Sequence, residues 1–172
     1  MVSAAHPLAA KAGYDILARG GSAVDAAIAV QMVLGLVEPE SSGIGGGAFL
    51  LHWSQHEQKL RTYDGRETAP AAARPDRFMR DGKPMGFMEA VVGGRSVGVP
   101  GVLRMLELAH HKHGRLPWAD LFKPAIDAAE QGFPLSPRLY AVLQEEQYLR
   151  NDPAALRVYY GKAVGERIVN RE

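Results

Sequence analysis

One arginine in this sequence stands where it could bind a carboxylate. Arg66 follows a predicted strand and the turn-type pair Asp64-Gly65, and Glu67 comes directly after it. A guanidinium group is planar and offers five N–H donors, so an arginine at a strand end can hold a carboxylate through two parallel hydrogen bonds. The alternative is an ordinary surface ion pair with Glu67, and the residue types by themselves favour this second interpretation.

A glycine run, SGIGGGAFLL at residues 42–51, raises the question of nucleotide binding. Gly43, Gly45 and Ala48 match the G-x-G-x-x-A spacing of a dinucleotide-binding loop, and Asp64 follows at a suitable distance. That loop must follow a strand and open a helix, whereas here a predicted helix precedes the glycines and a strand follows them. The reversed order argues against a dinucleotide site.

The same run does not form a phosphate loop either. Ala48 and Phe49 stand where a phosphate loop needs lysine and then serine or threonine. Consecutive glycines before a strand are instead typical of a backbone that lies too close to a neighbour for side chains to fit.

A histidine tract, formed by His110, His111 and His113, ends a predicted helix. Only His110 and His113 share a helical face, and no carboxylate stands at a matching offset for a metal site. Histidines in a last helical turn complement the helix dipole, so the pattern predicts a solvated helix end. We assign no metal ligand and no cofactor to this chain.

The elements that position these residues mix helices and strands. Periodicity, caps and breakers predict helices over residues 6–18, 22–37, 102–113, 118–131 and 137–149, and strands over residues 48–53 and 59–67. Ser22 and Asp25 form a capping box for the second helix, which is apolar on nearly every side and therefore expected to be buried all round. Residues 68–84 are proline-rich and irregular, with a turn at Asp81-Gly82.

Composition limits the function classes further. The chain has 172 residues, 47% of them hydrophobic, a formal charge of +1 and no cysteine. This balance gives no electrostatic reason to bind nucleic acid. The longest apolar run, residues 23–37, is shorter than the roughly 20 residues of a membrane span. Lys11 and Asp15 interrupt the N-terminal region, so it does not match a signal peptide.

Four motifs together resemble the gamma-glutamyltranspeptidase family: GGSAVDAAIAV (20–30), EPESSGIGGGAFLL (38–51), YDGRETAP (63–70) and SVGVPG (96–101). The similarity begins at about Ser3 and weakens beyond Leu149. It implies an α+β fold, the αββα sandwich of N-terminal nucleophile hydrolases, of which this chain holds only a part. Residues 1–172 are then the N-terminal portion, an incomplete domain, of the large subunit of a precursor that cleaves itself.

The resemblance also implies the chemistry. A threonine that begins the small subunit, outside this chain, attacks the γ-amide of glutathione or a related γ-glutamyl substrate, and its own α-amine acts as the base. No catalytic residue lies in the chain. Arg66 matches the family arginine that binds the α-carboxylate of the γ-glutamyl group, and we expect Gly45–Gly47 to lie close to Arg66 under the substrate cleft.

Two other functions remain open. A glutaryl or cephalosporin-type acylase shares the same family pattern, and a fragment that retains only the fold could be a non-catalytic binding or assembly module. The chain is expected to need the small subunit or self-association to cover its apolar surface. The compartment is undetermined, and would be periplasmic or secreted if the precursor carries a signal peptide.

Overall fold

The computed structural model describes residues 1–160, and the chain divides into two compact units. We call the first the helical unit; it joins residues 1–44 to the chain from Met105 onward. We call the second, residues 45–104, the hairpin unit. Helix α4 (Val102–His113) begins in the hairpin unit and continues in the helical unit.

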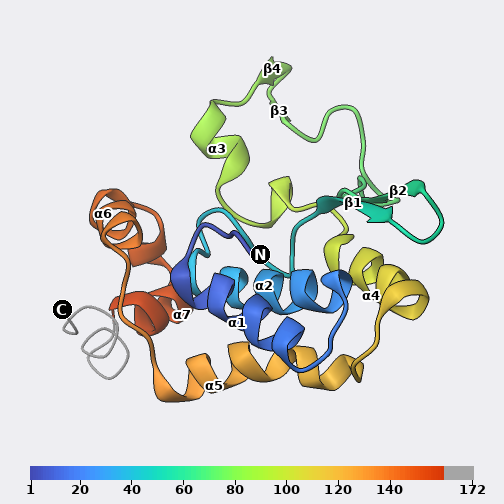
Figure 1. The fold of residues 1–172 in the computed structure, drawn as a ribbon. Helices are drawn as coiled ribbons and strands as arrows, with labels where there is room; N and C mark the ends of the chain where they lie inside the picture. Colours follow the sequence, from blue (N-terminus) through green and yellow to red (C-terminus); the bar gives the residue numbers. More distant parts are fainter. Residues whose placement is uncertain (161–172) are drawn as a thin grey trace. The chain divides into compact units, whose positions relative to one another are not determined.

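The helical unit begins with two helices that pack side by side, α1 (Pro7–Ala18) and α2 (Ala23–Val37) (Figure 1). Their starts follow from local signals. The backbone N–H of Leu8 donates to Nδ1 of His6 at 3.2 Å, which caps α1. Gly20, with a φ of 87°, takes the left-handed conformation that ends this helix. Both helices agree with the predicted ranges.

The capping box predicted for α2 is present. Asp25 N donates to Ser22 Oγ at 3.1 Å, and Ser22 N donates to the Asp25 carboxylate at 2.8 Å. The expectation of burial on every side is wrong in part, because Val30 and Leu34 remain half-exposed. The buried apolar positions of α2 are Val24, Ala26, Ile28, Ala29, Met32, Val33 and Val37.

The rest of the helical unit is broken into shorter pieces than the sequence predicts. The predicted helix 118–131 is a 3₁₀ turn, η2 (Trp118–Phe122), followed by α5 (Lys123–Gln131). Pro124 explains the break, because it has no N–H to donate to the carbonyl of Asp120. Both η2 and α5 contact α2, and Leu121 is fully buried.

The predicted helix 137–149 ends early, as α6 (Pro137–Glu145). The carboxylate of Glu146 accepts hydrogen bonds from the backbone N–H groups of Tyr148 and Leu149 at 2.8 and 3.2 Å. These bonds compete with the backbone hydrogen bonds that would continue the helix. The remaining elements are η3 (Leu149–Asn151), α7 (Pro153–Ala155) and η4 (Leu156–Tyr160). None of the helices in residues 1–160 is long and apolar enough to cross a membrane.

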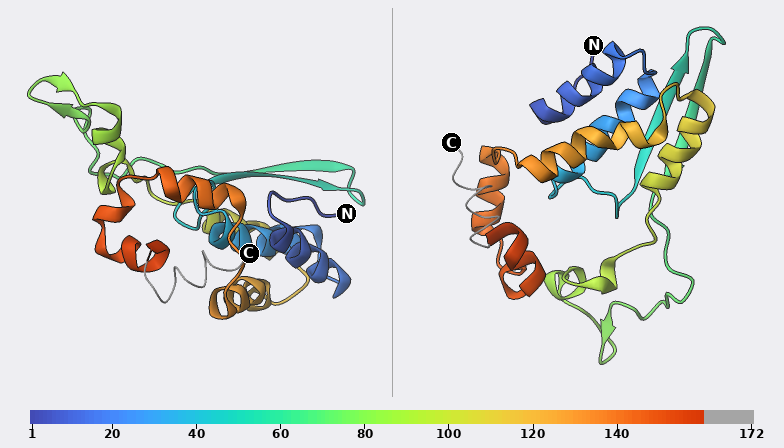
Figure 2. Two further views of the ribbon diagram at one scale, coloured as in Figure 1. Left: turned by 90° about the vertical axis from the view of Figure 1, so that its left-hand side faces the viewer. Right: turned by 90° about the horizontal axis from the view of Figure 1, so that it is seen from below.

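The hairpin unit is built on the two predicted strands, β1 (Ala48–Ser54) and β2 (Lys59–Gly65). They pair antiparallel in a register that sets Ala48 opposite Gly65 and Ser54 opposite Lys59. The two strands form a long twisted ribbon (Figure 2). This register brings the end of β2, and hence Arg66, to the start of β1.

The irregular stretch after β2 contains a small hairpin, β3 (Met79–Arg80) and β4 (Lys83–Pro84). The predicted turn lies between these strands: Asp81 and Gly82 have φ values of 50° and 75°, as hairpin turns of this length require. The sequence analysis did not predict the short α3 (Phe87–Val91) and the 3₁₀ turn η1 (Gly94–Ser96). The mixture of helices with two small antiparallel sheets agrees with the α+β class.

Candidate functional site

The backbone around Arg66 lies against the start of β1 without room for a side chain between them. A Cβ built on Gly47 would lie 2.7 Å from the carbonyl oxygen of Gly65 and 2.8 Å from Cα of Arg66. Ordinary carbon contacts begin at about 3.4 Å, so only glycine fits position 47 as the backbone stands.

A second glycine-rich segment encloses the other side of the same backbone. Thr68 and Val99 exchange two hydrogen bonds, with N···O distances of 3.3 and 2.8 Å. A Cβ on Gly98 would lie 2.8 Å from Cβ of Glu67, and one on Gly101 would meet the carbonyl of Gly65. The motifs SVGVPG and YDGRETAP are therefore packed backbone to backbone.

The two glycine segments also bond to each other. The carbonyl oxygen of Gly46 accepts the N–H groups of Gly101 and Val102, each at 3.2 Å. The predicted close approach near Arg66 is thus confirmed at Gly47. It is wrong at Gly45, because a Cβ there would meet no atom within 4 Å.

Arg66 itself is held at both ends. Its backbone N–H donates to Oδ1 of Asp64 at 2.9 Å, which fixes the turn after β2. Its Nη1 lies 2.9 Å from Oε2 of Glu67, with 57% of the arginine side chain exposed. The ion pair with Glu67 that the sequence analysis considered is therefore formed, and it leaves most of the five guanidinium N–H donors for other partners.

Arg66 lines a pocket of about 510 Å³ within the hairpin unit. Its charged lining consists of four arginines and one glutamate: Arg66, Arg74, Arg77, Arg95 and Glu67. A ligand with negative charge suits this lining, because arginine forks pair well with carboxylate and phosphate. Of these arginines, the sequence indicated Arg66 alone. Arg74, Arg77 and Arg95 have no regular spacing, and only the fold brings them to one pocket.

The histidine tract differs from the prediction of a solvated helix end. His110 is only 15% exposed at its side chain; its Nε2 lies 2.9 Å from the carbonyl oxygen of Leu116 and 3.6 Å from Oδ1 of Asp25. Its ring packs edge-on against Trp118, with centroids 5.2 Å apart. His111 is exposed as predicted, and its Nε2 lies 3.9 Å from Oε1 of Glu107.

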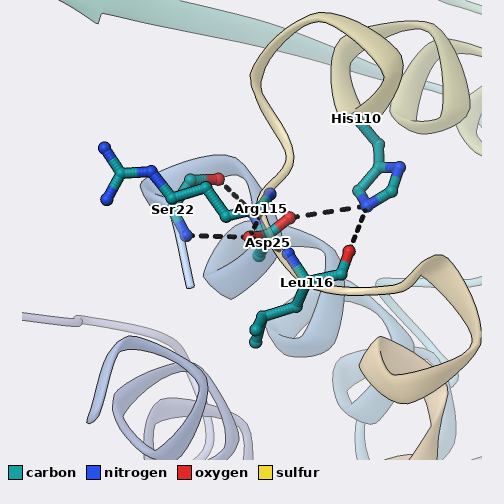
Figure 3. A network of polar contacts seen from close by, with 5 residues as sticks. All are labelled: Ser22, Asp25, His110, Arg115 and Leu116. Carbon is teal, nitrogen blue, oxygen red and sulfur yellow. Dashed lines mark hydrogen bonds and ion pairs between the residues drawn. The ribbon is translucent and has the colours of Figure 1, made fainter. Parts of the chain in front are cut away.

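Asp25 is the centre of this buried network (Figure 3). Besides the N–H of Ser22 in the capping box, its Oδ2 accepts the backbone N–H groups of Arg115 and Leu116 at 2.9 and 3.2 Å. One carboxylate thereby ties the start of α2 to the segment after α4. Sequence spacing could not reveal this partner for His110, because the two residues are 85 positions apart. Within residues 1–160 no three potential ligand side chains are grouped as a metal site would need.

Another part of the helical unit holds a buried acid. Glu38 is 4% exposed, and burial together with a hydrogen bond from the neighbouring Glu40 raises the pKa of its carboxyl group above the ordinary value. Arg138 lies 3.4 Å from Glu40 and opposes this shift. Burial lowers the pKa of His6 below its ordinary value.

Comparison with known proteins agrees with the motifs that converge on Arg66. The family model described as gamma-glutamyltranspeptidase matches residues 9–171. The chain belongs to this family. The glutathione hydrolase proenzyme of Bacillus subtilis is 42% identical over 160 residues, which cover 92% of this chain and 27% of that protein. The chain thus spans about a quarter of the length of this gamma-glutamyltranspeptidase relative.

Solved structures of gamma-glutamyltranspeptidases and related enzymes share the fold. The Helicobacter pylori gamma-glutamyltranspeptidase matches with a TM-score of 0.89 and 29% identity, over 95% of this chain and 47% of that chain. A cephalosporin acylase from Bacillus halodurans matches with a TM-score of 0.70 and 33% identity, over 95% of this chain and 30% of that chain. The expectation of an α+β fold that holds part of an N-terminal nucleophile hydrolase is confirmed.

Proposed function

We propose that this chain forms the N-terminal part of the large subunit of a gamma-glutamyltransferase, or glutathione hydrolase, and that Arg66 binds the α-carboxylate of its γ-glutamyl substrate. One observation carries the proposal: the backbone of Arg66 packs closely against Gly47 and Gly101 while Arg66 lines a pocket of about 510 Å³. A guanidinium group on so confined a backbone can hold a carboxylate in one orientation. Family membership supports the γ-glutamyl substrate class.

The role of Arg66 in the reaction is orientation. In the chemistry that the family resemblance implies, a threonine hydroxyl outside this chain adds to the γ-carbonyl of the substrate, and the α-amine of that threonine accepts the proton. The peptide amine then leaves with the proton, and water or an acceptor amine cleaves the γ-glutamyl ester. Binding the α-carboxylate at Arg66 fixes where the γ-carbonyl lies for both attacks.

Glu67 prepares Arg66 for this role. The ion pair at 2.9 Å occupies one Nη of the guanidinium group and restricts its rotamers before substrate binds. The remaining N–H donors stay available for a carboxylate. Because fewer side-chain conformations must be frozen on binding, the entropic cost of recognition falls.

The exposed surface of β1 supports a partner for this chain. Phe49, Leu51 and Trp53 alternate along one face of the strand and are 63%, 68% and 51% exposed. Contiguous large apolar side chains of this kind are typical of a surface that another polypeptide covers. We assign that role to the remainder of the precursor, including the small subunit.

Kinetics of the complete enzyme with Arg66→Lys test the proposal. Lysine keeps the positive charge but loses the bidentate fork, so we expect KM for γ-glutamyl donors to rise at least tenfold. Arg80→Lys is the matched control, because Arg80 is equally exposed, pairs with Glu89 and does not line the pocket. An unchanged KM in the Arg66 variant would refute the assignment.

The cephalosporin acylase match supports a second candidate, an acylase for glutaryl or cephalosporin-type side chains. A glutaryl group has no amino group beside its carboxylate, whereas a γ-glutamyl group does. Rates of the complete enzyme on γ-glutamyl anilide and glutaryl anilide separate the two functions. Faster turnover of the glutaryl compound would replace the transferase proposal with the acylase.

A further inference from the structure

The pocket that Arg66 lines has more positive charge than one substrate carboxylate requires. Three further arginines, Arg74, Arg77 and Arg95, line it together with Arg66. Among residues 1–160 the only acid in the lining is Glu67, which pairs with Arg66. Arg74 has a partner outside the lining, since its Nε lies 3.3 Å from Oδ1 of Asp76. The charges of Arg77 and Arg95 are left to be explained.

Arg77 and Arg95 each donate a side-chain hydrogen bond to the backbone of the other. Nε of Arg77 donates to the carbonyl oxygen of Arg95 at 2.6 Å, and Nη1 of Arg95 donates to the carbonyl oxygen of Arg77 at 3.3 Å. The Nη1 atom of Arg95 also lies 2.7 Å from Sδ of Met85. These contacts restrain both arginine side chains in the lining of one pocket.

Neither of these two arginines is paired with a carboxylate in residues 1–160. Arg77 is half-buried and Arg95 is exposed, so solvent screens the charge of Arg77 less than that of Arg95. Guanidinium groups that line one pocket without a carboxylate of their own suit an anionic ligand. The pair therefore has the charge of an anion subsite.

We infer that Arg77 and Arg95 bind the C-terminal carboxylate of the peptide that leaves, or accepts, the γ-glutamyl group. This inference rests on the proposed function, in which Arg66 takes the α-carboxylate of the same substrate. The leaving peptide and the acceptor peptide react at the same acyl carbon in opposite directions, so one subsite serves both. The substrate class is therefore γ-glutamyl peptides and short peptide acceptors with a free C-terminal carboxylate.

The size of the pocket agrees with such a substrate. Its volume of about 510 Å³ lies within the roughly 300–1,000 Å³ of small-molecule sites. A γ-glutamyl tripeptide has a free carboxylate at each end, and an extended chain of three residues spans about 10 Å, at roughly 3.3–3.6 Å per residue. Two carboxylates need two cationic positions, and Arg66 and the Arg77–Arg95 pair line the same pocket.

The test compares donors with and without the second carboxylate. In the complete enzyme, kcat/KM is measured for glutathione, for glutathione amidated at its glycine carboxylate, and for γ-glutamyl anilide. The wild-type preference is the kcat/KM for glutathione divided by the kcat/KM for amidated glutathione. We expect Arg95→Gln and Arg77→Gln each to lower this preference by about tenfold, mainly by raising KM for glutathione. Arg95→Lys should recover part of the ratio, and Arg80→Gln is the control outside the pocket.

Acceptors test the other half of the inference. With γ-glutamyl anilide as donor, Arg95→Gln and Arg77→Gln should each lower the preference for glycylglycine over glycylglycine amide by a similar factor. A ratio that stays at the wild-type value in both Gln variants, for donors and acceptors alike, overturns the subsite and leaves the two arginines a structural role.

Failure of the proposed function gives a different result. If Arg66 does not bind the α-carboxylate, Arg66→Lys leaves KM unchanged for the anilide, which has no second carboxylate. If Arg66 holds that carboxylate and only the subsite is wrong, Arg66→Lys raises KM for all donors while the ratios of the Arg77 and Arg95 variants stay unchanged.

Discussion

Replacing Gly47 with alanine tests whether close backbone packing positions Arg66. The new Cβ would lie 2.7 Å from the carbonyl oxygen of Gly65 and 2.8 Å from Cα of Arg66, where ordinary contact begins at 3.4 Å. The backbone at residues 65–66 must therefore move by about 0.7 Å, and its hydrogen-bonded neighbours resist that shift. Overpacking of this kind costs about 1–3 kcal/mol. Relatives of the complete enzyme are several times longer than this chain, and the Tm shift shrinks with length, so about 2 kcal/mol should lower Tm by about 1–2 °C.

The same displacement should reduce activity. A misplacement of about 1 Å in a positioning group costs up to about 100-fold, so a shift of about 0.7 Å at Arg66 should lower kcat/KM for γ-glutamyl donors at least tenfold. Both effects are measured on the complete enzyme, Tm by differential scanning fluorimetry and kcat/KM by steady-state kinetics with γ-glutamyl anilide.

Gly45→Ala is a matched control in the same glycine run. A Cβ at Gly45 meets no atom within 4 Å, and neither Gly45 nor Gly47 has a positive φ, so the two substitutions differ only in what the methyl group contacts. We expect Tm of Gly45→Ala to stay within about 0.5 °C of wild type, or to rise slightly as the unfolded chain loses freedom. Equal losses of Tm and kcat/KM in both variants would refute the packing argument.

Two further predictions concern the helical unit. Asp25→Ala leaves three buried backbone N–H groups without their acceptor. We therefore expect the free energy of unfolding, measured by urea titration, to fall by about 3 kcal/mol. The control Asp127→Ala changes an exposed residue and should lower it by less than about 0.5 kcal/mol. Equal losses would show that the Asp25 network contributes nothing. Burial and Glu40 raise the pKa of Glu38, so the folded state binds that proton more tightly than the unfolded state, and stability falls as pH rises through the folded pKa. The Tm of Glu38→Gln minus the Tm of wild type should therefore increase as pH rises from about 4 to about 7. For the exposed Glu130→Gln the same Tm difference should not change with pH. A Tm difference for Glu38→Gln that does not change with pH contradicts this reasoning.

Elements with strong local signals were predicted well from the sequence. The capping box of Ser22 and Asp25 and the bounds of α1, α2 and α4 depend on interactions within a few residues. The turn at Asp81-Gly82 is local in the same way. The early end of α6 was missed because Glu146 binds the backbone ahead of it, a competition that periodicity does not reveal.

Contacts between distant segments were not predictable in this way. Oδ2 of Asp25 accepts N–H groups from residues 115 and 116, and its Oδ1 lies 3.6 Å from Nε2 of His110. The same carboxylate looked like a helix cap alone. The spacing of the histidine tract could not indicate burial of His110, because its partners come from another part of the chain.

For the site, the sequence by itself determined which residue could hold a carboxylate and the turn in which it stands: Arg66 after Asp64-Gly65, beside Glu67. Only the tertiary structure decided what surrounds it. Gly47 and Gly101 lie about 20 and 35 positions away, and the packing of their backbones against residues 65 and 66 makes them neighbours. A local sequence pattern specifies the conformation of the residues within it. The surroundings of Arg66 depend instead on which distant backbone segments pair, and the packing of the whole unit determines that pairing.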